Sequence, residues 1–146
     1  MIEDREKIRR IIKTINCIEG LYEVSAKWKG VKANTLTLLY ALDDEEVHTQ
    51  KSISEGWLIP RTTLNTIIKE CVSDGYIMLK PIKGCRRDLR IALTNEGKEF
   101  TKKLLMDVYI AENMALSKTL ESCNEDFIES LKVFSENLKK MFENIE

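Results

Sequence analysis

The chain has one histidine, His48, and four cysteines that are scattered without a Cys-x-x-Cys pair. A structural zinc site needs closely spaced histidine or cysteine ligands, and a disulfide framework needs cysteines that occur densely in a short chain. We therefore expect neither a metal site nor disulfides. The acidic run at residues 43–46 is interpreted as a solubilising turn.

The sequence also lacks a long apolar run. No stretch approaches the roughly 20 residues of a membrane-spanning helix, and the N-terminus is charged from Glu3 onward, unlike a signal peptide. We expect no membrane association and a cytoplasmic location.

Patterns typical of enzymes are missing too. Gly84 stands alone in its loop, so no glycine-rich phosphate-binding motif occurs. His48 lies beside the acidic run and next to a helix start, where an ordinary exposed histidine is the better interpretation. We expect no enzymatic activity and no cofactor.

The charge that is present is segregated. The formal net charge is only −1, and 43% of the residues are hydrophobic, enough to bury a core. Residues 61–90 hold seven cations and three anions, whereas residues 121–146 hold three cations and seven anions. A basic surface on a nearly neutral protein is typical of a nucleic-acid-binding face, although solvated surface charge gives a similar pattern.

Residues 60–73 predict an amphipathic helix suited to the major groove of DNA. Leu64, Ile67, Ile68 and Cys71 recur at helical spacing on one face. The opposite face carries polar and cationic side chains that can hydrogen-bond base edges or phosphates. The residues of this helix expected to contact DNA are Arg61, Thr62, Thr63, Asn65, Thr66 and Lys69.

Two strands are expected after this helix, at residues 76–79 and 89–93. The connection between them is basic, with five cations and one anion from residue 80 to residue 90. A hairpin tip of that charge can reach phosphates or enter a narrow minor groove. The residues of this wing expected to contact DNA are Lys83, Arg86, Arg87 and Arg90.

This order of elements resembles the MarR family of bacterial winged helix-turn-helix regulators. The most specific match is Leu-Thr-Asn-Glu-Gly at residues 93–97, which resembles the end of that family's wing. Counting back puts residues 86–87 on the family's paired arginines, with Arg90 a secondary candidate. Cys85 then stands where the family has an aspartate that braces the wing. Either the brace is missing or Asp88 supplies it.

The fold class expected is mostly α with a small β-wing, in a single MarR-like domain. Further helices are expected at residues 2–28, 31–42, 50–55 and 94–120, and a last one after residue 125. Residues 31–95 would form the winged DNA-binding part, and residues 1–30 and 96–146 the helical dimerisation part. The apolar stripes of the terminal helices exceed what a small winged domain can cover. We therefore expect a homodimer that reads a palindromic operator in double-stranded DNA. We expect it to act as a repressor rather than as an activator.

The start of the third helix is a second expected contact with DNA. Thr49 is a plausible N-cap, and the amide end of a helix can receive a phosphate. The residues assigned to this role are Thr49, Gln50 and Ser52.

Two regulatory routes follow from the resemblance. In that family small, often aromatic compounds bind where the dimerisation helices meet the winged part, and some members respond to oxidants. The residues that could line such a crevice are Tyr22, Trp28, Tyr40, Met106 and Tyr109, although such a stripe is more often plain core. Cys85 lies among cations that make a thiol more reactive, so it is the candidate redox residue. The competing interpretation is a winged-helix adaptor that binds another protein instead of DNA.

Overall fold

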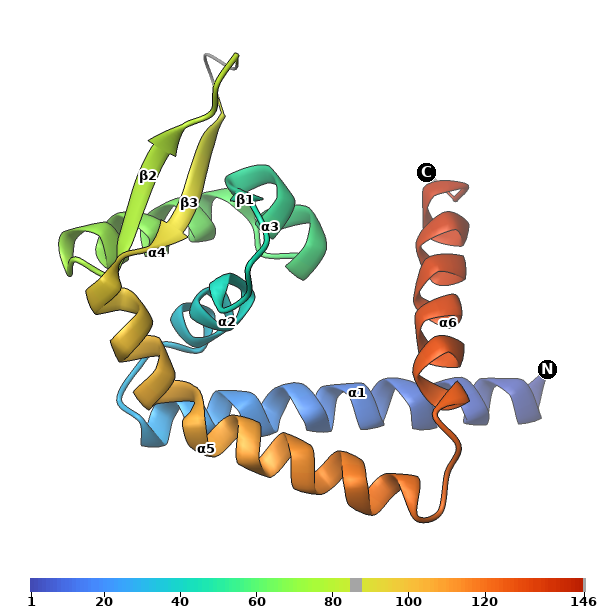
Figure 1. Cartoon of the computed structure of the whole chain (residues 1–146). Coiled ribbons are helices and arrows are strands. Elements are labelled where there is room, and N and C mark those ends of the chain that lie inside the picture. The colour runs from blue at the N-terminus through green and yellow to red at the C-terminus, as the bar shows by residue number, and fades with distance from the viewer. Residues whose placement is uncertain (85–87, 146) are drawn as a thin grey trace. The chain divides into compact units, whose positions relative to one another are not determined.

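A computed structural model describes residues 1–84 and 88–145 of the protein. The chain divides into two compact units, Met1–Met106 and Asp107–Glu146. The predicted fold class, mostly α with a small β-wing, is confirmed (Figure 1). The elements in chain order are α1 (Ile2–Trp28), α2 (Ala33–Leu42), β1 (His48–Thr49), α3 (Gln50–Trp57), α4 (Arg61–Ser73), β2 (Ile77–Pro81), β3 (Leu89–Leu93), α5 (Asn95–Leu120) and α6 (Asp126–Glu143).

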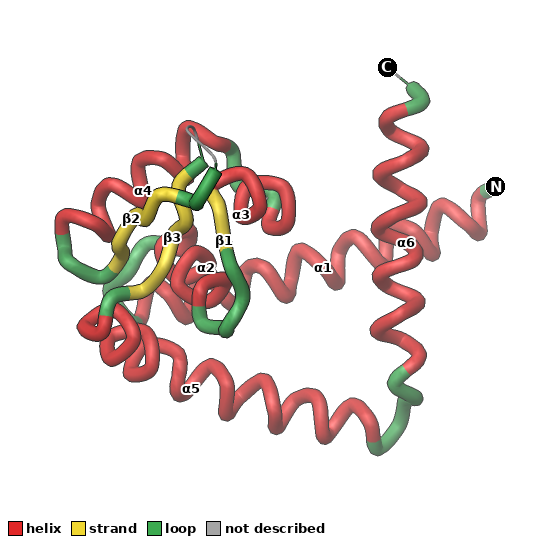
Figure 2. The backbone as a smooth tube through the Cα atoms, turned by 45° about the horizontal axis from the view of Figure 1, so that its top comes forward, coloured by secondary structure: helices red, strands yellow, loops and turns green. Residues whose placement is uncertain are grey.

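The core of the first unit lies where α2, α3 and α4 gather around the sheet (Figure 2). Leu38, Leu39, Ile53 and Leu64 are fully buried there. These side chains come from apolar stripes at helical spacing, which explains why each helix turns one face inward. Hydrophobic burial of this kind is the main stabilising term of a small domain.

The sheet is antiparallel, with β3 between β1 and β2. Ile77 pairs with Leu93 at the base of the β2–β3 hairpin, and Pro81 pairs with Leu89 toward its tip. Pro81 lacks a backbone donor, and it stands at the end of an edge strand, where that loss is tolerated. The hairpin thus projects as a wing from a base held by buried Ile77, Ile91 and Leu93.

Strand β1 corrects the expectation that His48 is an ordinary exposed histidine. His48 pairs with Ile91 of β3, and its side chain is only 16% exposed. Its Nε2 lies 2.6 Å from Oδ1 of Asp44, and this hydrogen bond holds the pKa of Asp44 below its usual range. A strand of two residues is too short to show a periodicity in the sequence. Its formation depends on a partner about 40 residues away in the chain.

The joint between the sheet and α5 is a close backbone approach. Oγ1 of Thr94 donates to the carbonyl oxygen of Gly75 (2.6 Å) and accepts from the backbone N–H of Gly97 (2.9 Å). A Cβ on Gly97 would overlap the carbonyl oxygen of Tyr76. Thr94 is therefore the N-terminal cap of α5, one residue before the helix begins, and Gly97 permits the helix to pass against the base of β2.

Several helix boundaries differ slightly from those expected. Helix α2 begins at Ala33 rather than at residue 31, and α3 continues through Gly56 to Trp57. Pro60 is the N-cap of α4 rather than a residue of its first turn. The connection between α3 and α4 therefore comprises residues 58–60 instead of residues 56–59.

The second unit contains the C-terminal part of α5 and all of α6. Helix α6 is strongly amphipathic in sequence, yet none of its residues is buried. Its apolar side chains include Phe127, Leu131, Met141 and Phe142, all exposed. None of the helices in the described residues has the length and apolar character that a membrane crossing requires.

Candidate nucleic-acid interface

Helix α4 has the two faces that its sequence predicts. Leu64, Ile67, Ile68 and Cys71 are buried. The opposite face is open, with Thr63 half-buried at its margin. The exposed side chains on this face are Arg61, Thr62, Asn65, Thr66 and Lys69.

The hydroxyl of Thr66 is partly engaged within the helix. Its Oγ1 donates to the carbonyl oxygen of Thr62, at 3.1 Å. The hydroxyl hydrogen is therefore used in the helix, and the oxygen can still accept. Thr66 suits a donor on a base or a thymine methyl group better than a phosphate.

The short turn before α4 sets the direction of this helix. Leu58 has φ +48°, a left-handed conformation that ends α3. Oγ of Ser54 then donates to the carbonyl oxygen of Ile59 at 2.7 Å, which ties the turn back to α3. Lys32 and Glu70 add an ion pair of 2.8 Å between the start of α2 and α4. These contacts hold α4 against the domain by its apolar side.

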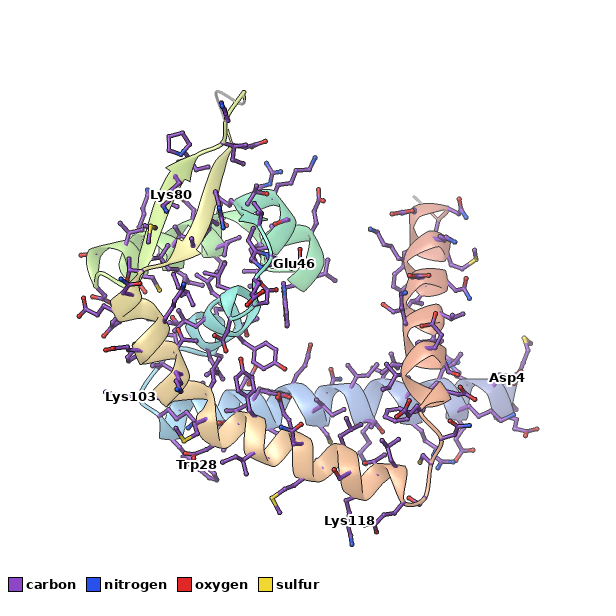
Figure 3. The ribbon with its side chains drawn as sticks, viewed as in Figure 1. Asp4, Trp28, Glu46, Lys80, Lys103 and Lys118 are labelled. Atoms are coloured by element: carbon purple, nitrogen blue, oxygen red, sulfur yellow. The ribbon has the colours of Figure 1, made fainter. Side chains whose placement is uncertain are left out.

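The wing carries its charge on both strands. Lys80 of β2 is paired with Arg90 of β3, and both are exposed; Figure 3 labels Lys80 on its strand. Like charges directly opposite each other on a sheet are destabilising. A bound polyanion would remove that repulsion. Lys83 is exposed nearer the tip.

Three of the residues singled out in the wing lie outside the described residues. They are Cys85, Arg86 and Arg87. Their assignments to redox sensing and DNA contact therefore rest on sequence alone.

The start of α3 is a complete capping box. Oγ1 of Thr49 accepts from the backbone N–H of Ser52 at 3.1 Å, and Oγ of Ser52 accepts from the N–H of Thr49 at 2.9 Å. Oγ of Ser52 also donates to the carbonyl oxygen of Thr49. Thr49 is thus the predicted N-cap. The Ser52 hydroxyl hydrogen is engaged internally, which leaves Thr49 and Gln50 as better phosphate donors.

A pocket of about 510 Å³ lies between α1, α2 and the α3–α4 turn. Of the residues predicted to form an effector crevice, Tyr22 and Tyr40 line it. Trp28 and Met106 do not, and both are exposed. Tyr109 belongs to the second unit.

The pocket contains an aromatic residue that is not among those predicted to form an effector crevice. Trp57 lines it, and its ring centroid lies 5.7 Å from that of Tyr40. No local sequence signal reveals the place of Trp57 in this pocket, because it depends on the meeting of three aromatic residues from separate helices in the tertiary structure.

The described cysteines differ in accessibility. Cys71 is buried in the apolar face of α4, and burial raises the pKa of its thiol to about 11. Cys17 and Cys123 are exposed. Across residues 1–84 and 88–145, no cluster of three or more histidine, cysteine or acidic side chains is arranged to hold a metal ion.

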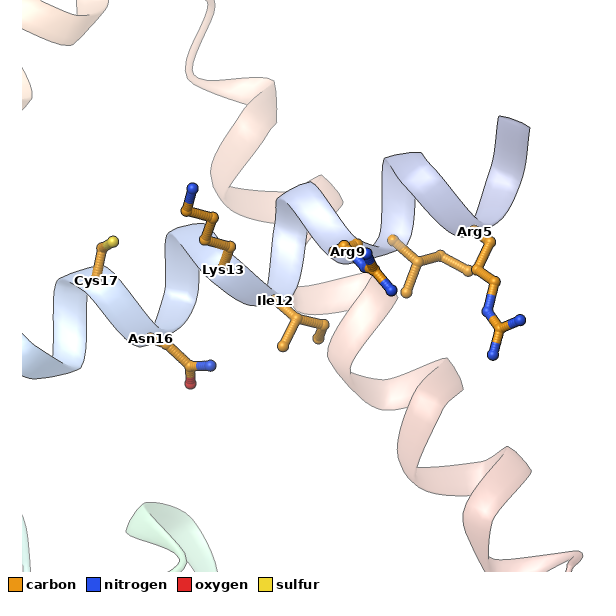
Figure 4. A pocket seen from close by; sticks show the side chains of 7 residues that line it. Arg5, Arg9, Ile12, Lys13, Asn16 and Cys17 are labelled. Carbon is orange, nitrogen blue, oxygen red and sulfur yellow. The ribbon is translucent and has the colours of Figure 1, made fainter. Parts of the chain in front are cut away.

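A second hollow follows the N-terminal half of α1. Its lining comes from that helix alone and combines isoleucines with cations (Figure 4). Arg5, Arg9 and Lys13 are spaced by one helical turn, and Ile8 and Ile12 lie between them. This face of α1 is both basic and apolar.

No protein-family model and no curated protein matches the sequence. Solved structures do match, and three represent them. A MarR family regulator from Neisseria meningitidis is 20% identical, with a TM-score of 0.73 over 96% of this chain and 99% of that one. A putative MarR family regulator from Listeria monocytogenes, complexed with 26mer DNA, is 20% identical, with a TM-score of 0.65 over 94% and 87%. Staphylococcus aureus MarR, in complex with salicylate and kanamycin, is 17% identical, with a TM-score of 0.68 over 98% and 95%.

Proposed function

We propose that this chain, which has the winged-helix fold of the MarR regulators, is a homodimeric, sequence-specific DNA-binding transcriptional regulator of the cytoplasm. A repressor is the form we favour. The observation that carries the proposal is the surface of the first unit. The polar face of α4 and the cationic wing are presented by one compact unit.

Helix α4 is the element suited to the major groove. Asn65 can make a bidentate contact to adenine, and Arg61 and Lys69 can contact guanine or phosphate. Thr62 and Thr63 are short enough to let the helix approach the bases closely. The buried face of α4 fixes it to the domain, so these side chains approach DNA with little loss of conformational freedom.

The wing is suited to the adjacent minor groove and to flanking phosphates. The exposed pair Lys80 and Arg90 and the nearby Lys83 concentrate positive charge on one hairpin. A narrow minor groove has an enhanced negative potential that attracts arginine and lysine. Arg86 and Arg87 would add to this charge, with Arg87 the residue that we assign to the minor groove.

A second copy of the chain is the proposed partner of the terminal helices. Helix α1 buries a single residue, Ala26, and leaves Ile8 and Ile12 exposed. Helix α6 buries none. The basic hollow on α1 and the acidic stretch at residues 121–146 are complementary in charge. Pairing between two copies would cover these apolar faces and place two copies of α4 about 34 Å apart on one side of a DNA duplex.

DNA binding is tested by fluorescence anisotropy of a labelled random-sequence duplex at low salt. We expect binding that weakens steeply as salt is added, because cationic contacts release counterions from the phosphates. The matched comparison is the double variant Lys80→Glu/Arg90→Glu, which should bind much more weakly while it melts at a similar temperature. An adaptor that binds only proteins would not bind the duplex even at low salt, and that result would refute the proposal.

Regulation by a small molecule is the second part of the proposal. The pocket between α1, α2 and the α3–α4 turn supports it, because it adjoins the segment from which α4 starts. Binding there can shift the position of the recognition helix. Its lining residues also indicate what kind of molecule would bind.

A further inference from the structure

The pocket between α1, α2 and the α3–α4 turn has an aromatic wall built from three helices. Tyr22 of α1 and Tyr40 of α2 are 6.5 Å apart between ring centroids, at an interplanar angle of 79°. Tyr40 and Trp57 of α3 are 5.7 Å apart at 71°. Each ring therefore stands nearly at right angles to the next, and all three line the pocket.

These rings are accessible. Trp57 is 45% exposed and Tyr22 is 37% exposed. Aromatic faces carry partial negative charge, and tryptophan binds cations best among the aromatic residues. Rings set at right angles can present two faces to one bound group, which is the arrangement of an aromatic cage.

The charged side chains of the pocket are all acidic. Glu19 and Glu23 line it from α1, and among residues 1–84 and 88–145 no lysine or arginine lines it. Within the described part of the chain neither carboxylate has an ion-pair partner, whereas Glu3 pairs with Lys7 one turn from the N-terminus of the same helix. Glu19 and Glu23 are one helical turn apart, a spacing at which like charges repel. A cation between them would relieve that repulsion.

We propose that this pocket binds an organic cation, a quaternary or protonated amine that carries an apolar body. The positive group would lie against Trp57 and the tyrosines, with Glu19 and Glu23 supplying the counter-charge. The apolar body would contact Ile18 and Leu36, which also line the pocket. At about 510 Å³ the pocket has the size of small-ligand sites in general. An anionic aromatic compound would be repelled by the two carboxylates.

The pocket is connected to the proposed DNA-binding helix through its lining. Trp57 is the last residue of α3, Ile59 lies in the α3–α4 turn, and Pro60 is the N-cap of α4. A ligand that binds two conformations of this turn with different affinities changes the affinity of the protein for DNA. DNA then changes the affinity for the ligand by the same factor. This effector role rests on the DNA-binding function proposed above, whereas cation binding does not.

Binding is measured by isothermal titration calorimetry of the full chain without DNA. The probe is benzyltrimethylammonium, compared with neopentylbenzene, which has the same shape without the charge, and with benzoate, which is an anion. We expect the cation to bind about tenfold or more tightly than the neutral probe, and benzoate to bind weakest. Equal affinity for the cation and its neutral isostere would overturn the proposal.

Variants assign the binding to these residues. The double variant Glu19→Gln/Glu23→Gln should lose about fivefold to tenfold in affinity for the cation and nothing for the neutral probe. Its control is Glu45→Gln/Glu46→Gln, which removes the same charge from the exposed acidic turn and should leave cation affinity unchanged. Equal losses in both would mean that net charge alone attracts the probe, and would overturn the site.

The aromatic wall is tested separately with Trp57→Leu and Tyr40→Leu. Each substitution should lower the affinity for the cation about fivefold more than the affinity for the neutral probe, because leucine keeps apolar contact but removes the ring face. Melting temperatures of both variants show whether the fold is retained. If one variant fails to fold, the other still tests the aromatic cage. An unchanged preference for the cation over the neutral probe in the folded variant would refute the cage.

The effector role has its own measurement. DNA affinity is determined with and without saturating benzyltrimethylammonium. Calorimetric binding of the cation without any change in DNA affinity would refute the effector role and leave the site standing. Failure of the chain to bind DNA at all would refute the proposed function, and the calorimetric result on the pocket would be unaffected.

Discussion

The absence of a side chain at Gly97 allows α5 to pack directly against the base of β2. Because a Cβ at this position would overlap the carbonyl oxygen of Tyr76, Gly97→Ala must push α5 away from the base of β2. The stacked rings of Tyr76 and Phe100, 4.2 Å apart between centroids, would be disturbed as well. We expect a loss of about 1–3 kcal/mol in the free energy of unfolding, measured with chemical denaturant.

The matched control is Gly56→Ala. Gly56 is also helical, but no atom lies within 4 Å of the position where its Cβ would be. Alanine should therefore stabilise the protein, by up to about 1 kcal/mol, through the lower entropy of its unfolded chain. If both variants lose the same stability, the close approach at Gly97 is not the cause.

Asn65 is the residue whose substitution should alter sequence preference most specifically. It is exposed on α4, and its side chain has no hydrogen-bond partner among residues 1–84 and 88–145, so Asn65→Ala should leave the melting temperature nearly unchanged. A bidentate amide–adenine contact contributes about 1–3 kcal/mol of discrimination. The preferred bases, determined by selection from a random duplex pool, should change at one position in each half-site. Asn113→Ala, the same change on α5, should alter none.

Cys71 should be the least reactive of the described cysteines. Burial raises the pKa of its thiol to about 11, so the thiol stays protonated at neutral pH. Iodoacetamide should modify Cys71 only after the protein is unfolded, as peptide mass spectrometry would show. The folded state holds this proton more tightly than the unfolded state. Stability should therefore fall as pH rises from about 9 toward 11. Early labelling of Cys71 would contradict this account.

At the scale of elements, the wing is expected to supply affinity rather than sequence discrimination. Arg87→Ala removes one charge from each hairpin and should weaken binding to all duplexes alike. The plot of log affinity against log salt should flatten by about one unit for each protomer. Arg87 lies outside the described residues, so this prediction rests on the sequence. The control is Lys118→Ala on α5, which should leave the slope unchanged.

The elements also show how far the sequence alone can lead. Helices α1, α4 and α5 have the expected bounds within a residue, because their apolar residues recur over several turns. In addition, Pro60 marks the start of α4, and Thr94 marks the start of α5. Strand β1 was missed, since two residues show no period and His48 is ordered by Ile91 and Asp44. The exposed side chains of α4, which we propose to face DNA, could be identified from the sequence because they lie opposite its apolar face.

The pocket could be predicted only in part. Tyr22 and Tyr40 were candidates because they occur on helices expected to flank a crevice. Trp57 was not, because Gly56 before it indicated a turn, whereas the helix continues and directs the indole toward Tyr40. The meeting of side chains from α1, α2 and α3 depends on helix packing, which no local sequence signal encodes.

At the scale of the whole molecule, dimerisation should depend on the apolar face of α6. Leu131 is exposed on that face, and a charge in a buried dimer interface is strongly unfavourable. Leu131→Glu should therefore shift the protein toward a monomer, seen by sedimentation equilibrium, and weaken DNA binding. Lys132→Glu introduces the same group on the polar side of α6 and should keep the dimer. A monomeric wild-type chain would refute the proposed assembly.

The central claim is that two copies of α4 and two wings read DNA together, one helical turn apart. Selection from a pool of fully randomised duplexes, followed by sequencing of the bound fraction, tests it most directly. We expect enrichment of a palindrome whose half-site centres lie about 10 base pairs apart. Enrichment of a single unpaired half-site, or of no sequence at all, would contradict it.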